Sequence, residues 1–194
     1  DFKIYLKSSG EISYKPFPKP HLLVENASLS LPGNEENGHF IKTSNLKIFI
    51  SLRNIYLRSF NELISTEISD TNLNINLIDL KKIRNHLYET VNKPIFFSNC
   101  KIFIKNKDNE VIIISPVSKI NYRINNKTKI KSFFIEGKLF GFNFKSDWNR
   151  NYDLPKKSSH LINLVNPSIE IKNLFEFEGV KKFNGNTQIS YAQD

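Results

Sequence analysis

Residues 66–77 read TEISDTNLNINL, and the last six positions alternate between asparagine and an aliphatic residue. Successive side chains of a β-strand point to opposite faces, so the asparagines would lie on one face and the aliphatic residues on the other. The aliphatic residues are Leu73, Ile75 and Leu77. This stretch predicts a strand with one apolar face and one face in water.

The same period of two recurs along most of the chain. Leu46, Ile48, Ile50 and Leu52 share one face of a second run, opposite mostly polar residues. Other strand-like runs are 22–31, 102–104, 111–114, 120–124, 133–144 and 169–171, and polar turn sequences lie at 32–38, 106–110, 124–129 and 183–186. Short strands joined by polar turns predict a mainly β, mostly antiparallel open sheet of seven or more strands.

Two segments depart from this pattern. Residues 78–94 place apolar side chains at helical spacing, with Asp79 as a candidate N-cap and Pro94 after the end, so we expect one amphipathic helix at an end or edge of the sheet. Residues 145–168 have no clear period, and we expect a long loop there with a short element around 161–165.

Prolines are dense just before the first long strand. Residues 16–20 read PFPKP. Proline is tolerated at strand starts and at sheet edges, where it discourages unwanted pairing. We therefore expect residues 22–31 to form an edge strand.

The chain has a formal net charge of +9, which raises the possibility of a polyanionic partner. Only 5 of its 28 basic residues are arginine, whereas Asn and Ile each occur 25 times. Lys, Asn and Ile share A/T-rich codons, so genome composition accounts for much of the charge. Residues 131–145 interleave aromatic and basic residues, but their phenylalanines occupy both faces of a strand, so we expect no nucleic-acid partner.

Residue types that carry catalysis are few and scattered. The four histidines lack metal-ligand spacing, and no nucleophile elbow or phosphate-binding loop is present in the sequence. Cys100, the single cysteine, lies in a strand-like run without a nearby histidine, which indicates a buried inert thiol. We expect neither an enzyme nor a cofactor or metal site.

The order of features from residue 14 onward resembles the N-terminal part of the AsmA family, which is related to the TamB-like β-groove proteins. A proline-containing lead precedes a strand of the form P-x-L-x-V-x-x-A-x-L, matched by Leu22, Val24, Ala27 and Leu29. The turn PGNEENG, Phe40 with the strand at 46–52, and TEISDTNLNINL follow in the family's order, and IFFSNCKIFIKNKDN and FFIEGKLFGFNF fill its next segments.

This resemblance implies a single β-groove (taco-like) domain over residues 1–194, or a fragment of a longer chain with loose halves 1–94 and 95–194. It implies a curved sheet that carries the acyl chains of phospholipids between the inner and outer membranes of a Gram-negative bacterium. The location implied is the periplasm, with an N-terminal anchor in the inner membrane that this sequence lacks, and other envelope proteins as further partners. The chain does not begin with Met, and no run approaches the ~20 apolar residues of a membrane span.

The residues expected to line the groove come from three strands. They are Leu46, Ile48, Ile50, Leu52, Leu73, Ile75, Leu77, Phe140, Phe142 and Phe144. A rival interpretation is a factor for outer-membrane protein assembly that binds partners by strand addition. A third, a fragment of an outer-membrane barrel, is disfavoured by the expected helix and by strands that are apolar on both faces.

Overall fold

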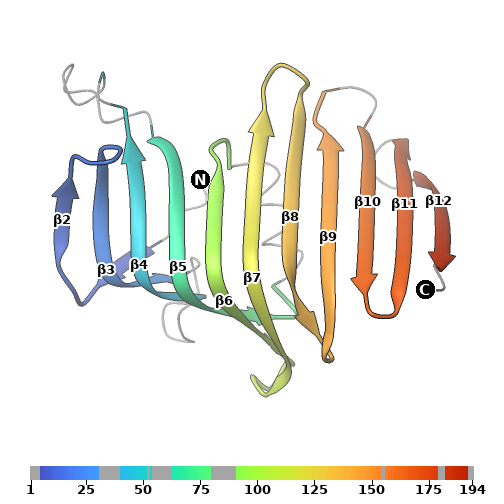
Figure 1. Cartoon of the computed structure of the whole chain (residues 1–194), viewed down its shortest axis with the longest axis horizontal. Coiled ribbons are helices and arrows are strands. Elements are labelled where there is room, and N and C mark those ends of the chain that lie inside the picture. The colour runs from blue at the N-terminus through green and yellow to red at the C-terminus, as the bar shows by residue number, and fades with distance from the viewer. Residues whose placement is uncertain are drawn as a thin grey trace. The chain divides into compact units, whose positions relative to one another are not determined.

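The computed structural model describes residues 5–30, 40–51, 53, 63–79, 91–153, 156–178 and 182–191. Nearly all of them lie in strands of one mostly antiparallel sheet (Figure 1). The strands are β1 Tyr5–Ser8, β2 Ile12–Lys15, β3 His21–Ser30, β4 Ile41–Ile50, β5 Leu63–Asn76, β6 Ile95–Lys105, β7 Val111–Asn125, β8 Ile130–Leu139, β9 Phe142–Asn151, β10 Lys156–Val165, β11 Ser168–Glu178 and β12 Lys182–Tyr191.

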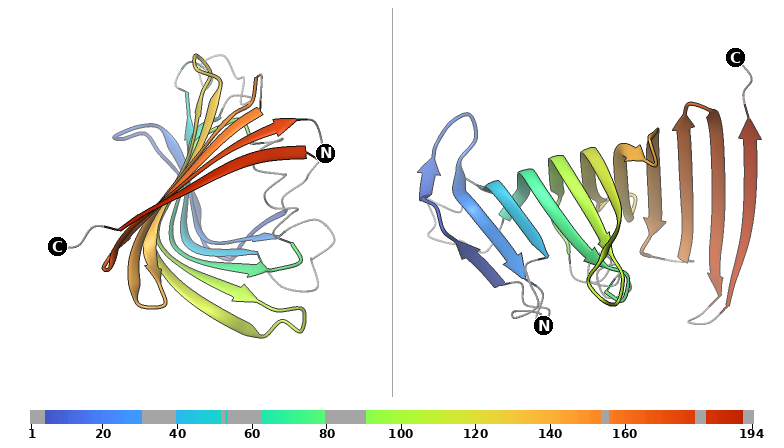
Figure 2. Two further views of the ribbon diagram at one scale, coloured as in Figure 1. Left: turned by 90° about the vertical axis from the view of Figure 1, so that its right-hand side faces the viewer. Right: turned by 90° about the horizontal axis from the view of Figure 1, so that it is seen from below.

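The strand order is β1-β3-β4-β5-β6-β7-β8-β9-β10-β11-β12, with β2 beside β3. The order does not return to its start, so the sheet of the described residues is open, and the prediction of a mainly β, curved, open sheet is confirmed (Figure 2). Most of the helix expected over 78–94 falls on residues outside the described ranges. The chain divides into two compact units, residues 1–116 (unit 1) and 117–194 (unit 2), and the boundary lies within β7.

The proline-rich stretch of unit 1 is a turn. Residues 16–20 connect β2 to β3, whose pairing runs from Lys15↔His21 to Ile12↔Val24. Both short strands, β1 and β2, pair with the same side of β3, and β4 pairs with its other side. The expectation that residues 22–31 form an edge strand is therefore wrong, because the sequence before the prolines supplies the edge.

One pair of neighbouring strands, β5 and β6, is parallel. A parallel pair cannot be joined by a tight turn and needs a crossover connection of a dozen or more residues. Residues 78–94, for which the sequence predicts a helix, belong to this connection between Asn76 at the end of β5 and Ile95 at the start of β6.

Four neighbouring strands of unit 1 interrupt their alternation at the same level. In each strand, two consecutive polar residues lie between two residues whose side chains both point to the other face of the sheet. The segments are Val24-Glu25-Asn26-Ala27 in β3, Thr43-Ser44-Asn45-Leu46 in β4, Ile68-Ser69-Asp70-Thr71 in β5 and Phe97-Ser98-Asn99-Cys100 in β6. We call these segments the polar step. The register on either side of the step is unchanged, because each strand carries the same extra residue.

The backbone at the polar step explains its residue types. Asn26, Asp70 and Asn99 have φ values of 48°, 54° and 52°, in the left-handed region that Asn and Asp tolerate better than other non-glycine residues. The Asn99 side-chain amide also donates a hydrogen bond to the Asp70 carboxylate, which links the step between β5 and β6.

The polar step bends the strands that carry it. An extra residue in a strand produces a bend and increases the local twist. Figure 2 shows β5 and β6 bent along their length, whereas β11 and β12 lack both the step and a comparable bend. The polar step also contacts the edge of the sheet, because Gly10, between β1 and β2, lies against Glu25. A Cβ at position 10 would lie 2.7 Å from the Glu25 carbonyl oxygen.

Unit 2 consists of the rest of β7 and the antiparallel strands β8 to β12. In β7 the order Val117-Ser118-Lys119-Ile120 repeats the polar step, but β8 has no matching residue, so the register shifts between Val117 and Lys119. The polar step therefore does not continue from β7 into β8.

Two sequence-based expectations for unit 2 are wrong. Residues 133–144 form two strands, because Phe140 and Gly141 have φ values of 50° and 86° and make a tight two-residue turn between β8 and β9. Positive φ at both central positions is the geometry that matches the twist of a hairpin. Residues 145–168 contain most of β9 and all of β10 rather than a loop.

The polar step gives a direct test by substitution. We expect Asn99→Val to lower the free energy of unfolding by about 1–2 kcal/mol or more, because a β-branched residue is strained in the left-handed region. Asn99→Gly should have a much smaller effect. Asn72→Val, at an exposed position of β5 outside the step, is the matched control. Denaturant titration followed by circular dichroism measures the difference, and equal stability of the Asn99→Val and Asn72→Val variants would contradict the assignment.

Candidate functional site

The apolar side chains of unit 1 gather on one face of the sheet, because residues paired in register share a face. We call it the apolar face of unit 1. Its cross-strand rows are Leu22–Ile48–Thr66–Ile95, Val24–Leu46–Ile68–Phe97, Ala27–Thr43–Thr71–Cys100 and Leu29–Ile41–Leu73–Ile102, with Ile75–Ile104 beyond them. The predicted alternation of β4 and β5 places Leu46, Ile48, Leu73 and Ile75 together on this face, which the sequence pattern anticipated.

The centre of this face is tightly packed. Val24, Ala27, Leu46 and Ile68 form a cluster of buried side chains, against which Leu29, Ile48, Ile95 and Phe97 pack while partly exposed. The neighbouring row is more polar, and the Thr71 hydroxyl donates to the Thr43 hydroxyl at 3.2 Å. Both rows flank the polar step.

The structure separates the predicted groove residues of unit 1 by accessibility. Leu46, Ile50 and Leu73 are buried, whereas Ile48 and Ile75 are half-buried. Leu77 is exposed in the turn after β5, and Leu52 lies outside the described residues. Within the described part of β4 and β5, Ile48 and Ile75 are therefore the predicted residues that combine the right face with access.

The three predicted phenylalanines do not share one strand. Phe140 is 74% exposed at the turn between β8 and β9, and Phe142 pairs with Leu139 next to that turn. Phe144 is half-buried and pairs with Gly137 on one side and Leu164 on the other. The turn at Phe140 and Gly141 therefore places Phe140 outside the strand that contains Phe142 and Phe144.

Unit 2 has an apolar face of its own, which extends across β7 to β11. Its rows from one end of the strands are Val117–Gly137–Phe144–Leu164–Ile169, Ile120–Ile135–Ser146–Ile162–Ile171, Tyr122–Phe133–Trp148–His160–Asn173 and Ile124–Lys131–Arg150–Ser158–Phe175. The first two rows are almost wholly apolar. The last two become polar, so this face changes character along the strands.

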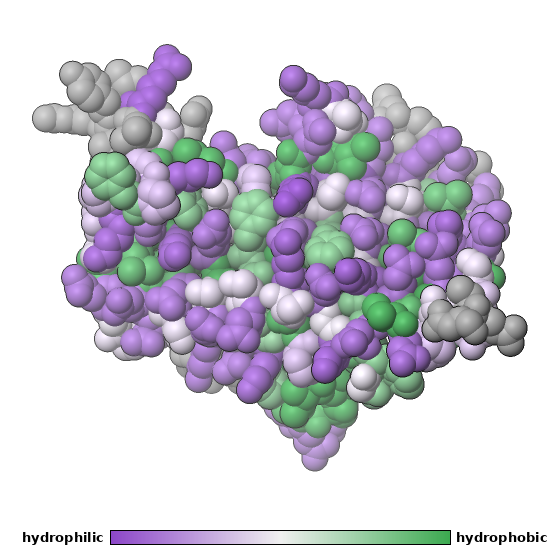
Figure 3. Space-filling model, in the orientation of Figure 1, coloured by the Kyte–Doolittle hydropathy of each residue, from purple (hydrophilic) through white to green (hydrophobic). Residues whose placement is uncertain are grey.

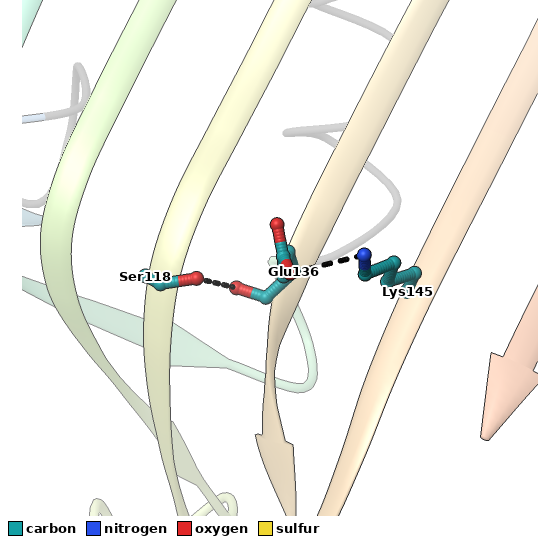
Figure 4. Close-up of polar contacts among 3 residues, drawn as sticks. All are labelled: Ser118, Glu136 and Lys145. Carbon is teal, nitrogen blue, oxygen red and sulfur yellow. Dashed lines mark hydrogen bonds and ion pairs between the residues drawn. The ribbon is translucent and has the colours of Figure 1, made fainter. Parts of the chain in front are cut away.

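The opposite face of unit 2 is charged and internally paired. Glu136 lies beside Lys145, with 3.4 Å between carboxylate and ammonium, and the Ser118 hydroxyl donates to the Glu136 carbonyl oxygen (Figure 4). Further ion pairs join Lys157 to Glu176 and Lys172 to Glu170. The polar alternate residues of β8 to β11 thus leave the other face for apolar contacts.

A polar cluster sits within the apolar face of unit 2, on β9 and β10. The Trp148 and His160 rings stack with 5.1 Å between centroids, and the Trp148 indole N–H donates to the Ser158 hydroxyl. His160 Nε2 lies 2.8 Å from the Ser146 hydroxyl. Burial lowers the pKa of His160 below its usual value, which favours a neutral ring at pH 7.

Candidate reactive groups include metal-ligating side chains and the single thiol. No group of three His, Cys, Asp or Glu side chains could hold a metal ion in the part of the chain that the structure describes. Burial raises the pKa of Cys100 to about 11, opposed by a hydrogen bond with Thr71, so the thiol is protonated and unreactive at pH 7. A hollow of about 310 Å³ on the polar side of the step is lined by Asn26, Lys42, Ser44, Asp70 and neighbouring polar residues.

A further apolar surface lies on the β6–β7 hairpin of unit 1. Val111, Ile112 and Ile114 are 45%, 51% and 57% exposed. Figure 3 shows a hydrophobic area in the lowest part of the view, above a hydrophilic tip, where Figure 1 places this hairpin. The tip contains the polar turn that Asn106 closes through its side chain.

No protein-family model matches the chain, and no curated protein matches it. Among the described residues, no helix is both long enough and apolar enough to cross a membrane.

Sequence reasoning missed the polar step and the cluster on β9 and β10. The step has a visible signal, because two polar residues that include Asn or Asp interrupt the alternation in VENA, ISDT and FSNC, each after an apolar residue. The cluster was hidden because residues 145–168 mix Trp, His, Ser and charged residues with no clean period.

The state of Cys100 provides a test of packing at the apolar face of unit 1. With a pKa of about 11, about 1 thiol in 1,000 is ionised at pH 8, against about a quarter for an ordinary cysteine. We expect a thiol-specific reagent to label the native chain far more slowly than the denatured chain at pH 8. Labelling of the native chain at the rate of the denatured chain would contradict the burial of this strand.

Proposed function

We propose that this chain is a non-enzymatic lipid-binding module, whose apolar faces carry phospholipid acyl chains between membranes. The observation that carries the proposal is the separation of faces. Each unit has one face on which aliphatic and aromatic side chains predominate and are partly accessible, and an opposite face that is mainly polar. In unit 1 the mainly polar face also carries four apolar residues, which are Leu23, Phe49, Phe96 and Phe103. The outline resemblance to the AsmA family supports the same function, with the periplasm and an inner-membrane anchor as its setting.

The energetics favour acyl chains as ligands for such a surface. Each methylene moved out of water contributes about 0.8 kcal/mol, and this contribution needs no specific hydrogen bond. A surface of this kind requires continuity rather than particular chemical groups. The half-buried side chains of Ile48, Ile75, Ile95 and Phe97 supply such contacts in unit 1.

Substitutions on the two faces of β5 test the proposal. We expect Ile75→Asp to weaken binding of a fluorescent phospholipid at least tenfold, because a carboxylate on the apolar face would have to be desolvated by the acyl chain. Ile48→Asp on β4 should act in the same way. Asn72→Asp introduces the same charge on the polar face of β5 and should leave binding unchanged.

Circular dichroism and Cys100 labelling confirm that each variant keeps its sheet. If the folded Ile75→Asp and Ile48→Asp variants bind phospholipid as well as the wild type, acyl chains do not lie on this face. If both variants unfold, these positions belong to an ordinary core, and the lipid-binding assignment loses its residues in unit 1.

A second candidate function, binding of a partner protein by strand addition, has its own support. In the described residues β12 has β11 as its neighbour on one side, is ten residues long, and is exposed from residue 184 to 191. Such an edge can accept another strand. A proline at a β12 position whose backbone N–H does not bond to β11 would remove a donor from this edge, so strand addition predicts weaker capture of envelope proteins by this variant while phospholipid binding is unchanged.

A further inference from the structure

The apolar face of unit 2 is amphipathic along its strands. On β8 the residues of this face change from Ile135 through Phe133 to Lys131, and on β9 from Phe144 through Trp148 to Arg150. Phe144 and Arg150 are six positions apart along β9, which corresponds to about 20 Å. A surface that is apolar at one end and cationic at the other matches an amphiphile with an apolar tail and an anionic head.

The cationic end places like charges side by side. Lys131 and Arg150 are directly paired across β8 and β9, an arrangement that is unfavourable on a sheet when the charges have the same sign. Burial, and to a lesser extent Arg150, lowers the pKa of Lys131. The Nζ atoms of Lys129 and Lys131 lie 5.8 Å and 5.7 Å from the centroid of the Tyr152 ring, which brings a third cation to the same end.

Neutral polar residues adjoin the cationic end. Trp148 and Ser158, which hydrogen-bond to each other, lie beside Arg150 on the same face, and His160 follows on β10. Arginine binds the oxygens of a phosphate in a planar two-pronged geometry, and lysine adds a point charge.

We propose that unit 2 binds anionic phospholipids in preference to zwitterionic ones, with the phosphate headgroup at Lys131 and Arg150 and the acyl chain along Phe133, Ile135 and Phe144. This inference rests on the proposed lipid-binding function and adds the headgroup class and the orientation. The preference arises from charge-assisted hydrogen bonds, so we expect about tenfold tighter binding of the anionic lipid.

Trp148, the single tryptophan of the chain, reports directly on this surface. The probes are lysophosphatidylglycerol and lysophosphatidylcholine with the same brominated acyl chain, because bromine quenches tryptophan fluorescence on contact. In the wild type we expect quenching by both lipids, with the anionic one effective at about tenfold lower concentration. The Lys131→Gln/Arg150→Gln variant should bind the two lipids equally, at the concentration that lysophosphatidylcholine requires in the wild type.

Two controls make the comparison specific. Lys119→Gln/Lys145→Gln removes the same charge from the opposite face of unit 2 and should keep the tenfold preference. Lys131→Arg/Arg150→Lys keeps both charges and should also retain most of it. Equal binding of both lipids by the wild type, or a preference that survives in the Lys131→Gln/Arg150→Gln variant, would overturn the headgroup assignment and leave the lipid-binding function standing. Absence of quenching by either lipid would overturn both.

Discussion

The structure depends on the constraint that neighbouring strands must keep their side chains in phase. An extra residue in one strand of a sheet would turn all later side chains of that strand to the wrong face. In unit 1 the extra residue is accommodated because β3, β4, β5 and β6 all carry it at the same level. Backbone hydrogen bonding therefore propagates a local irregularity across the unit, and the sheet bends without mixing its faces.

This constraint links the sequence to the proposed function. Asn26, Asp70 and Asn99 adopt the left-handed conformation at low cost, so they place the bend. The residues on either side of them, such as Val24 with Ala27 and Ile68 with Thr71, meet on the apolar face. A single sheet can thus combine a tightly packed centre with accessible apolar positions further along its strands.

The sequence predicted the fold class well because strand patterning is a local property. The alternation at 72–77 fixed both the strand and its apolar face, which contains Leu73 and Ile75. Turn chemistry was less visible: the turn between β8 and β9 contains Phe140 at a positive φ, which no residue preference would suggest, and residues 133–144 looked like one strand. The parallel pairing of β5 and β6 depends on distant segments, so no local pattern could reveal it.

The candidate site was predicted only in part for the same reason. Alternation identifies which residues share a face but not which of them are covered, so buried Leu46 and half-buried Ile48 could not be distinguished. The cationic end of unit 2 requires the register of β8 with β9, which brings Lys131 beside Arg150 across the hairpin. Sequence spacing gives no indication of that pairing when one of the two strands is taken for a loop.

The central claim is that the apolar faces hold acyl chains in the cell. Native mass spectrometry of the chain, purified without added lipid or detergent, tests it most directly. We expect a folded charge-state distribution in which part of the protein carries the mass of one or more phospholipids, released intact on collisional activation. A folded chain that appears only at its bare mass, with no phospholipid in an organic extract of the same sample, would contradict the account.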